Sequence, residues 1–588
     1  MPQSSNSLRA WRALPALAVL GGLVHGAARW WVCDDAFIVF RYAKNLHDGL
    51  GLVYNAGERV EGCTNLLWVL WTSLAFVFGV APETWTNLTS LACFAAVLAI
   101  LGRLHAAWAD GLGRPRGVPL AALALAAWPD ACVYATNGLE TSAFMLALVG
   151  GYALTLRAER LAAPARGLFL AGSCFGLGSL LRPDGSVPAF VAGLFVLWLF
   201  RPRVKAGAAF AAGFALCWIP AEAWRLLYYG EFYPNTYYAK SVNLAWYDQG
   251  LYYLRIYLER YWPLLFAPPL ALLARRKLKR EQEALKDDSL KTRSPEFEIR
   301  SVLFPAALAA VYAFLVVRAG GDFMFARLLV PVTPFVLLIL DASMLALRPR
   351  PGLHAAAAGA LILGPWAGIL ARPPQVEFGR GIVDERAFYL ESLFPAAVER
   401  NAEALKRYTQ GLDARILTFG TEARLAYRSE VPVSIEGHGL TDRTIARAPL
   451  ERRTRPGHEK LPDPAYLLFE RRVHFMFSEQ AYFELLRLDR WIPTYRVGLG
   501  EAQALILTWD PVLMDELRRR GARVPDFLDD LDRLTARLGE MTDAGAGELY
   551  RLTRNFYFRN HPDPEREAPF KRRLGLEGPP RDGPPGRE

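Results

Sequence analysis

The feature that most constrains this chain of 588 residues is a series of apolar runs between about residue 12 and residue 371. Each run is long enough, or nearly so, to cross a bilayer as a helix. Beyond them the sequence has an ordinary polar composition. The pattern predicts a polytopic α-helical membrane domain followed by a soluble domain. The runs fall at about residues 13–30, 66–81, 86–104, 118–133, 142–156, 167–181, 186–200, 206–221, 254–274, 301–317, 328–347 and 353–371.

Short basic clusters connect many of these runs, and they set the topology. By the positive-inside rule they face the cytoplasm. We therefore interpret the net charge of +10 as topology determinants and not as a nucleic-acid surface. If all the runs crossed the membrane, several of these clusters would lie outside. The clusters are Arg114 with Arg116, residues 157–166, 201–205 and 275–280, and Arg348 with Arg350.

One run is predicted not to cross, and residues 66–81 fit best. The run is short, and Trp68 and Trp71 favour the membrane interface. Treating it as an interfacial or re-entrant helix leaves about eleven transmembrane helices and places every basic cluster inside. The first loop and the C-terminal part then lie outside the cytoplasm. We therefore predict a multi-pass protein of the cytoplasmic membrane with an external C-terminal domain.

The C-terminal part is predicted to be a small soluble α/β domain. Its strand candidates are ILTFG, VPVSIE, AYLLFE and ALILTW, and residues 511–558 have helical spacing of apolar side chains. The end of the chain is rich in Pro and Gly, which is typical of disorder. The predicted domains are a transmembrane domain at 1–371 with an external loop at 31–85, an α/β domain at 372–575 and a disordered tail at 576–588.

The densest group of charges lies in residues 31–68, directly after the first apolar run. It begins with two adjacent carboxylates, Asp34 and Asp35. Carboxylates at the exit of a transmembrane helix cost free energy unless they are paired or face water, so they indicate a site. The alternative is a solvated loop with scattered charges, which the mixture of acidic, basic and aromatic residues makes less attractive.

The other outer segments add polar groups that the topology places on the same face. Arginine and lysine at this level suit a phosphate head group, and aromatics beside carboxylates suit sugar rings. Each segment also has a plainer interpretation, such as a local salt bridge, a snorkelling lysine or an ordinary loop. The predicted phosphate-binding residues are Arg41, Arg182, Lys240 and Arg327. The predicted substrate-binding residues are Tyr42, Glu61, Asn65, Glu140, Asp184, Tyr233, Asn235, Tyr238, Asp322 and His438.

These motifs resemble those of the GT-C superfamily of glycosyltransferases that use polyprenyl-phosphate sugars. The chain is most similar to the family of the mycobacterial terminal arabinofuranosyltransferase, whose relatives in other bacteria are named flagellar motor control protein. The resemblance covers most of the chain up to about residue 475. The motifs are DDAFIVFRYAKN (34–45), GLVYNAGERVEGCTNLLW (51–68), NGLETSAF (137–144), LRPDG (181–185), EFYPNTYYAK (231–240), GGDFMFARLLVP (320–331) and IEGHGLTDRTIAR (435–447).

The resemblance implies a catalytic aspartate in the first external loop, either Asp34 or Asp35, and a helix lying along the membrane in that loop. It implies an inverting transfer from a polyprenyl-phosphate sugar to a glycan, lipid or protein acceptor outside a bacterial cytoplasmic membrane. No cofactor is required, and no metal-ligand spacing is present, although a divalent cation is compatible with the carboxylates. The competing classes are a lipid-linked sugar transporter and a non-catalytic membrane scaffold or motor-control protein.

Overall fold

The structure is a computed structural model, and it describes residues 5–284, 297–348, 350–370, 376–391, 394–420, 422–450, 452–477 and 480–576. The chain divides into two compact units. The first unit holds residues 1–392 and also residues 450–459, whereas the second holds residues 393–449 and 460–588. The predicted boundary after residue 371 and the disordered tail lie in part outside the described residues, and both stay predictions.

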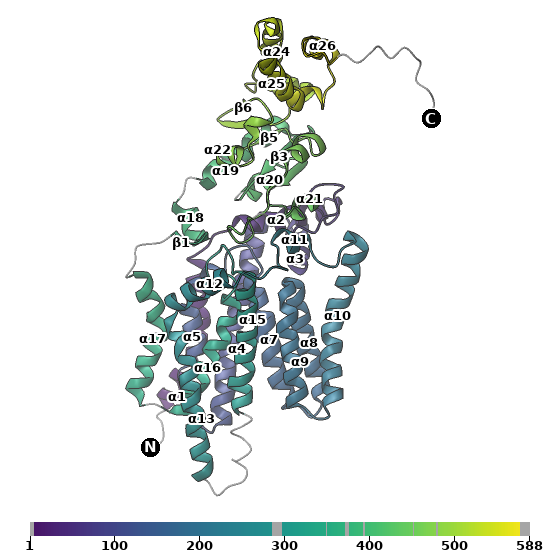
Figure 1. Ribbon diagram of the computed structural model, residues 1–588. Coiled ribbons are helices and arrows are strands. Elements are labelled where there is room, and N and C mark those ends of the chain that lie inside the picture. Colours follow the sequence, from purple (N-terminus) through teal and green to yellow (C-terminus); the bar gives the residue numbers. More distant parts are fainter. Residues whose placement is uncertain are drawn as a thin grey trace. The chain divides into compact units, whose positions relative to one another are not determined.

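The first unit is built almost entirely from helices (Figure 1). Most of them run side by side, and α2, α3 and α11 lie together at one end of this bundle. The helices are α1 (Ser5–Ala27), α2 (Asp34–His47), α3 (Leu66–Val77), α4 (Pro82–Gly111), α5 (Leu120–Ala127), α6 (Pro129–Val133), α7 (Thr141–Ala158), α8 (Pro164–Leu181), α9 (Ser186–Leu199), α10 (Arg203–Tyr229), α11 (Asn235–Ala239), α12 (Tyr247–Arg260), α13 (Ala267–Ala284), α15 (Phe304–Ala319), α16 (Thr333–Leu347), α17 (Pro351–Leu370) and α18 (Glu385–Glu391).

Among the described residues, five helices are long and apolar enough to cross a membrane. The predicted count of about eleven spans goes beyond these five and stays a prediction, as does the side on which each loop lies. Helix α3, in the run predicted not to cross, has 12 residues. At 1.5 Å per residue it is about 18 Å long, which is shorter than the hydrocarbon core. The five spans are Pro82–Gly111, Thr141–Ala158, Arg203–Tyr229, Ile299–Ala319 and Val330–Leu347.

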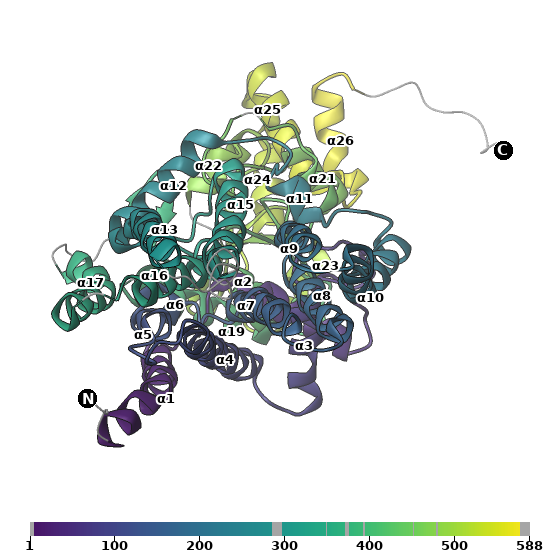
Figure 2. The ribbon, with the colours of Figure 1, turned by 90° about the horizontal axis from the view of Figure 1, so that it is seen from below.

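Helices α8 and α10 pack at very close range (Figure 2). A Cβ atom added to Gly172 would lie 2.0 Å from the carbonyl oxygen of Phe210, and one added to Gly213 would lie 2.0 Å from that of Phe169. Only glycine permits this approach of the two backbones. Small residues at a helix interface are a common device in membranes, where lipid tails remove the hydrophobic drive for helix association.

A short two-stranded sheet follows α17 in the sequence, and it pairs with the loop before α16. Strands β1 (Glu377–Gly379) and β2 (Ile382–Val383) pair antiparallel. Val383 also forms a bridge to the loop before α16. Its amide donates to Phe323 O at 2.8 Å, and its carbonyl accepts from the Phe325 amide at 2.9 Å. Helix α18 begins two residues later.

The second unit contains a five-stranded mixed sheet with the order β4-β3-β5-β7-β6. The β3–β4 and β3–β5 pairs are parallel, whereas β5–β7 and β6–β7 are antiparallel. Its helices pack an apolar core against the sheet. The strands are β3 (Arg415–Thr418), β4 (Val433–Glu436), β5 (Phe475–Met476), β6 (Tyr495–Leu499) and β7 (Ala502–Ile506). The helices are α19 (Phe394–Thr409), α20 (Ala423–Arg428), α21 (Arg443–Ala446), α22 (Gln480–Leu485), α23 (Pro511–Arg519), α24 (Phe527–Ala536), α25 (Asp543–Thr553) and α26 (Pro564–Arg573).

The strand predictions for this unit are confirmed in part. ILTFG and VPVSIE coincide with β3 and β4, ALILTW overlaps β7, and the helical spacing of 511–558 matches α23 to α25. The strand predicted at AYLLFE is wrong, because Tyr466–Glu470 forms a helical turn. Both Leu467 and Leu468 are buried there. A short apolar run can be buried in either conformation, so its composition alone does not separate helix from strand.

Candidate active site

The two predicted catalytic aspartates begin helix α2, and the NGLETS segment holds that helix start in place. The amide of Cys33, the residue before α2, donates to Asn137 O at 3.1 Å. Gly138 has φ +82°, and an added Cβ would lie 2.8 Å from the Cβ of Ala36. Asp34 is 3% exposed, whereas the side chain of Asp35 is 27% exposed. The two neighbours therefore have different surroundings, as expected of adjacent positions on a helix.

Arg327 joins Asp35 to two further carboxylates. Its Nη1 lies 3.2 Å from Asp35 Oδ2 and 3.6 Å from Asp322 Oδ2, and its Nη2 lies 4.0 Å from Glu140 Oε1. Burial alone would lower the pKa of the Arg327 guanidinium, but Asp322, Glu140 and Asp35 outweigh burial and raise it. The motifs DDAFIVF, NGLETS and GGDFMFAR thus meet at one cation, although they are far apart in the sequence.

A second arginine extends this network. Arg182 Nη1 lies 3.4 Å from Glu140 Oε1, and two of its nitrogens donate to the carboxylate of Asp184 at 3.2 and 3.1 Å. Asn65 donates to Glu140 Oε2 at 2.8 Å. Glu140 precedes α7 but makes no side-chain cap to that helix. Its carboxylate instead links loop one to the RPDG segment. We call this cluster the charged network: Asp35, Asn65, Glu140, Arg182, Asp184, Asp322 and Arg327.

Two predicted residues on α2 hold the first loop itself. Arg41 is buried and donates to Tyr54 O at 2.8 Å and to Asn55 Oδ1 at 3.2 Å. Tyr42 donates to Val60 O at 2.6 Å and accepts from the Gly62 amide at 2.7 Å. These contacts organise the loop backbone over residues 54–62. The predicted phosphate role of Arg41 and substrate role of Tyr42 stay predictions.

Glu61 forms a buried ion pair that the sequence did not reveal. Its Oε2 accepts from Arg225 Nε of α10 at 2.7 Å, and Arg225 also pairs with Glu222. Burial raises the pKa of Glu61 to about 7, although Arg225 opposes the shift. The backbone carbonyl of Glu61 accepts from the Asn235 amide at 2.9 Å. This pair therefore fastens loop one to α10 and to the start of α11.

The YPNTYYAK segment forms α11, and its side chains are arranged as an aromatic group. The rings of Tyr233 and Tyr237 stack with centroids 4.4 Å apart, and Tyr238 donates to Glu231 Oε2 at 3.5 Å. Asn235 is buried. Lys240 ends the helix, and its Nζ makes no ion pair or hydrogen bond with the described residues. It is thus an uncompensated cation, as a phosphate ligand would be.

Residues 450–459 return from the second unit's part of the sequence and belong to the first unit. An added Cβ on Gly457 would lie 3.6 Å from Lys240 Cε, so this segment lies against that lysine. Arg453 donates to Ser241 O at 3.1 Å. The guanidinium of Arg455 lies 4.8 Å from the ring centroid of Phe323, within the GGDFM motif. Sequence reasoning did not single out these arginines.

His438, the remaining predicted site residue, lies in the second unit. It is buried, and its Nδ1 lies 3.1 Å from Lys460 O. Its amide donates to Glu436 Oε1 at 3.0 Å, and its ring lies 5.4 Å from that of Phe419. These contacts order the end of β4. A substrate role for His438 stays a prediction.

Two buried acids near the charged end of the bundle were missed by sequence reasoning. Asp130 in α6 pairs with Arg260 at 3.4 Å and accepts from the Tyr261 hydroxyl. Its signal was present, because it is an aspartate inside an apolar run. Glu385 opens α18 and is 3% exposed. It stands in an ordinary polar sequence, GIVDERAF, which gives no local sign of burial.

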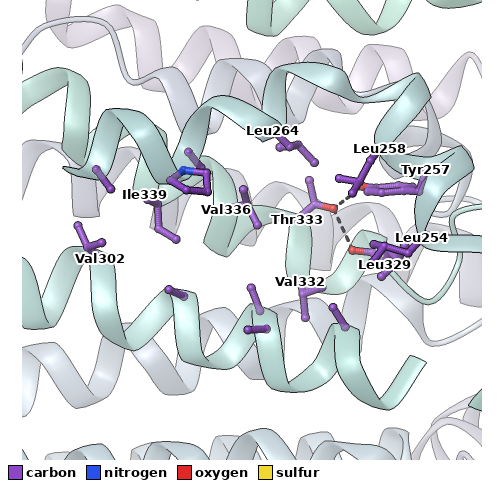
Figure 3. Close-up of a pocket in the computed structure, with 17 residues that line it drawn as sticks. Leu254, Tyr257, Leu258, Leu264, Val302, Leu329, Val332, Thr333, Val336 and Ile339 are labelled. Carbon is purple, nitrogen blue, oxygen red and sulfur yellow. Dashed lines mark hydrogen bonds between the residues drawn. The ribbon is translucent and has the colours of Figure 1, made fainter. Parts of the chain in front are cut away.

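An apolar cavity of about 350 Å³ lies among α12, α13, α15 and α16 (Figure 3). Leu254 and Leu258 line one end of it, and Val302 and Ile339 lie toward the other. The hydroxyl of Thr333 forms hydrogen bonds with the Tyr257 hydroxyl and with the carbonyl of Leu329. The lining also includes Leu329 itself, two residues beyond Arg327. One end of the cavity is therefore close in sequence to the charged network.

No group of three or more His, Cys, Asp or Glu residues within the described part of the chain is placed to hold a metal ion. The carboxylates of the charged network are instead paired with Arg182 and Arg327. The prediction that no cofactor is required, with a divalent cation compatible with the site, stays a prediction.

Two solved structures share this architecture. They are crystal structures of ArnT from Cupriavidus metallidurans, one bound to undecaprenyl phosphate and one in the apo state. The TM-scores are 0.53 and 0.54, both at 14% sequence identity. The matches cover 86% and 85% of this chain and 98% of each ArnT chain. The chain therefore has an ArnT-like fold.

Two curated proteins are similar to this chain over part of its length. Both are terminal β-(1→2)-arabinofuranosyltransferases, from Mycobacterium tuberculosis and Corynebacterium glutamicum. They are 31% identical over 428 residues (65% of this chain) and 28% identical over 406 residues (62%). The chain spans 66% and 56% of the two relatives, which is less than two thirds. No protein-family model matches the chain. The chain is thus a distant homologue of these transferases.

Proposed function

We propose that this protein is a membrane glycosyltransferase that transfers a sugar from a polyprenyl-phosphate donor to an acceptor in the cell envelope. The observation that carries the proposal is the ion pair of Asp35 with Arg327, which joins this loop-one carboxylate to the rest of the charged network. The names of the homologues favour arabinofuranose as the sugar and a β-(1→2) linkage in the product. Undecaprenyl phosphate in one ArnT structure favours a polyprenyl-phosphate donor.

The chemistry is an inverting displacement at the anomeric carbon. The acceptor hydroxyl oxygen attacks that carbon, the bond to the phosphate oxygen breaks, and polyprenyl phosphate leaves with the bonding electrons. The hydroxyl proton passes to a carboxylate acting as general base. One oxygen of Asp35 is held by Arg327. We therefore assign the positioning of Arg327 to Asp35. We assign proton removal to Asp34, the first aspartate after the predicted span, which is 3% exposed.

We assign the binding of the donor phosphate to Lys240. Arg327 and Arg182 are already compensated by carboxylates of the charged network. Lys240 has no such partner among the described residues. A cation on the leaving phosphate stabilises the charge that develops as the bond breaks. The apolar cavity that includes Leu329 offers a place for part of the polyprenyl chain between helices.

We propose that transfer takes place on the outer side of the cytoplasmic membrane. The positive-inside rule supports this side, because it places the first loop opposite the basic clusters. The side chains proposed to act on the substrate all belong to segments that this topology assigns to the outer face. The sequence shows no nucleotide-binding fingerprint, which agrees with a lipid-linked donor.

The test is sugar transfer in proteoliposomes with a radiolabelled polyprenyl-phosphate arabinofuranose and an oligoarabinofuranoside acceptor. Asp34→Asn should lower turnover at least about 10²-fold while donor binding survives, because the amide keeps the size of the side chain but accepts no proton. Asp35→Asn should lose less. Asp48→Asn is the matched control, because Asp48 is an exposed aspartate at the end of the same helix. Full activity of both the Asp34 and the Asp35 variants would refute the proposed mechanism.

A further inference from the structure

Glu385 is a buried acid at the candidate site that the mechanism above does not use. It is 3% exposed, and its Oε2 has no hydrogen-bond partner among the described residues. A buried polar atom without a partner lowers the stability of the fold, so such atoms are rare in folded proteins. Because Glu385 lies beside the candidate active site, we expect a ligand atom to form a hydrogen bond with its Oε2.

The fold attaches Glu385 to the charged network through the backbone. Val383, two residues earlier, pairs with Phe323 and Phe325 through two hydrogen bonds. Those residues lie between Asp322 and Arg327, which both belong to the charged network. Burial is the main influence that raises the pKa of Glu385. The charged groups that act on it are Asp35, Arg327, Asp34 and Asp322.

We infer that Glu385 is a substrate-contacting residue, and that its buried Oε2 hydrogen-bonds to a hydroxyl group of a bound sugar. The inference rests on the proposed function, because it assumes that sugars enter this site. It adds a contact from the segment after the last apolar run to a site otherwise built from the loops between helices.

The chemistry of a neutral carboxylic acid fits a sugar hydroxyl. A protonated carboxyl both donates and accepts a hydrogen bond, as a hydroxyl does. An ionised carboxyl would accept only, and it would add one more negative charge beside Asp34 and Asp35. A sugar hydroxyl can therefore hydrogen-bond to neutral Glu385, and the site gains no further negative charge. The hydroxyl belongs to either the donor sugar or the acceptor sugar.

Two substitutions separate this role from a structural one. Glu385→Gln keeps a neutral side chain of the same shape that donates and accepts. Glu385→Leu fills the space but has no polar atom. If Glu385 were only a packing residue, Leu would be tolerated, because it removes a buried polar atom that has no partner. Glu377→Leu is the matched control, since Glu377 is an exposed acid on the neighbouring strand β1.

The donor arm measures binding of polyprenyl-phosphate arabinofuranose and of undecaprenyl phosphate, which lacks the sugar. The acceptor arm measures KM for the oligoarabinofuranoside. We expect Glu385→Leu to weaken one of the two sugar-bearing ligands at least about fivefold. We expect unchanged affinity for undecaprenyl phosphate and an unchanged melting temperature, or a higher one. Glu385→Gln should stay within about twofold of the wild type.

Three results would overturn the inference. Unchanged sugar binding in both arms for Glu385→Leu would assign Glu385 to packing. Equal losses in Glu385→Gln and Glu385→Leu would mean that the ionised carboxylate is needed. A wild-type protein that binds neither lipid would reject the proposed function itself, and this inference with it. The first two results leave the proposed function standing, so the two failures are distinguishable.

Discussion

Two cations predicted to bind phosphate, Arg327 and Lys240, have opposite surroundings at the scale of single residues. Arg327 is buried among three carboxylates, so removing it would leave those charges without a counter-ion. Loss of activity in such a variant would not distinguish binding from folding. Lys240 has no ionic partner among the described residues, and it lies at the end of a short helix. Its charge can therefore be removed with little effect on the fold.

Replacement of Lys240 by alanine should weaken donor binding about ten- to a hundredfold, because a hydrogen bond to a charged group contributes about 1.5–3 kcal/mol. The measurement is the affinity for undecaprenyl phosphate in detergent, with the melting temperature as a check of folding. Lys279→Ala, at an exposed position of α13, serves as the control. An affinity equal to that of the wild type would show that Lys240 is not a phosphate ligand.

Glu61 should make stability depend on pH. Its pKa is raised to about 7, so the folded protein holds this proton more tightly than the unfolded chain does. The stabilisation is complete below the ordinary carboxyl pKa and is lost as the pH rises through about 7. We expect the melting temperature of the wild type to fall relative to Glu61→Gln between about pH 5 and pH 8.

The control for this pH series is Glu259→Gln, because Glu259 lies exposed on α12. Its melting temperature should follow that of the wild type across the same range. Parallel curves for the wild type and Glu61→Gln would mean that Glu61 stays ionised in the fold, with Arg225 outweighing its burial.

At the scale of elements, α8 and α10 depend on glycine for their contact. Gly172 and Gly213 each face a backbone carbonyl of the other helix at a distance that leaves no room for a side chain. The contact matters to the site because Arg182 follows α8 directly, and Arg225 of α10 holds Glu61. A shift of one helix against the other would move both arginines.

Gly213→Ala should lower the stability of the folded protein, because overpacking of a tight contact costs about 1–3 kcal/mol. A fall in melting temperature in detergent measures the effect. Gly150→Ala in α7 is the matched control, because an added Cβ there meets nothing within 4 Å. The two variants should differ clearly, and equal melting temperatures would contradict the close contact described for α8 and α10.

Sequence patterns predicted some elements well and others not at all. The short β-type runs ILTFG and VPVSIE are separated by the helix-like TEARLAYRS, and they overlap β3 and β4 with α20 between them. Strand β5 has only two residues, Phe475 and Met476, so it is too short to give a periodic signal. The run at AYLLFE was misassigned because burial, not periodicity, determines its composition. Short buried segments take their conformation from tertiary contacts that the local sequence does not contain.

The same limit applies to the site. Asp35, Glu140 and Arg327 stood out because they are charged residues near the ends of apolar runs. Their convergence on one ion-pair network was expected only from the topology, and the structure supplies the distances. Glu385 and Arg225 were missed for different reasons. Glu385 is surrounded by ordinary polar sequence. Arg225 lies inside a long helix, and the local sequence does not show that its partner, Glu61, lies in the first loop.

At the scale of the whole molecule, the topology is open to a direct test. Asp48→Cys and Glu501→Cys, in a background without native cysteines, should both react with an impermeant thiol reagent in whole cells. Arg280→Cys should react only after the membrane is opened, because its basic cluster is predicted to face the cytoplasm. All three positions are exposed in the structure. Labelling of only one of the first two would mean that residues 66–81 cross the membrane after all.

The chain passes between the two units three times, at residues 392–393, 449–450 and 459–460. A domain joined by a single linker can be exchanged, trimmed or expressed alone, and the second unit is not joined in that way. Cutting the gene at residue 392 would also remove residues 450–459, which lie against Lys240. Chimaeras with related transferases should therefore keep both units from one parent. In evolution, too, the two units are expected to have been inherited together and not shuffled.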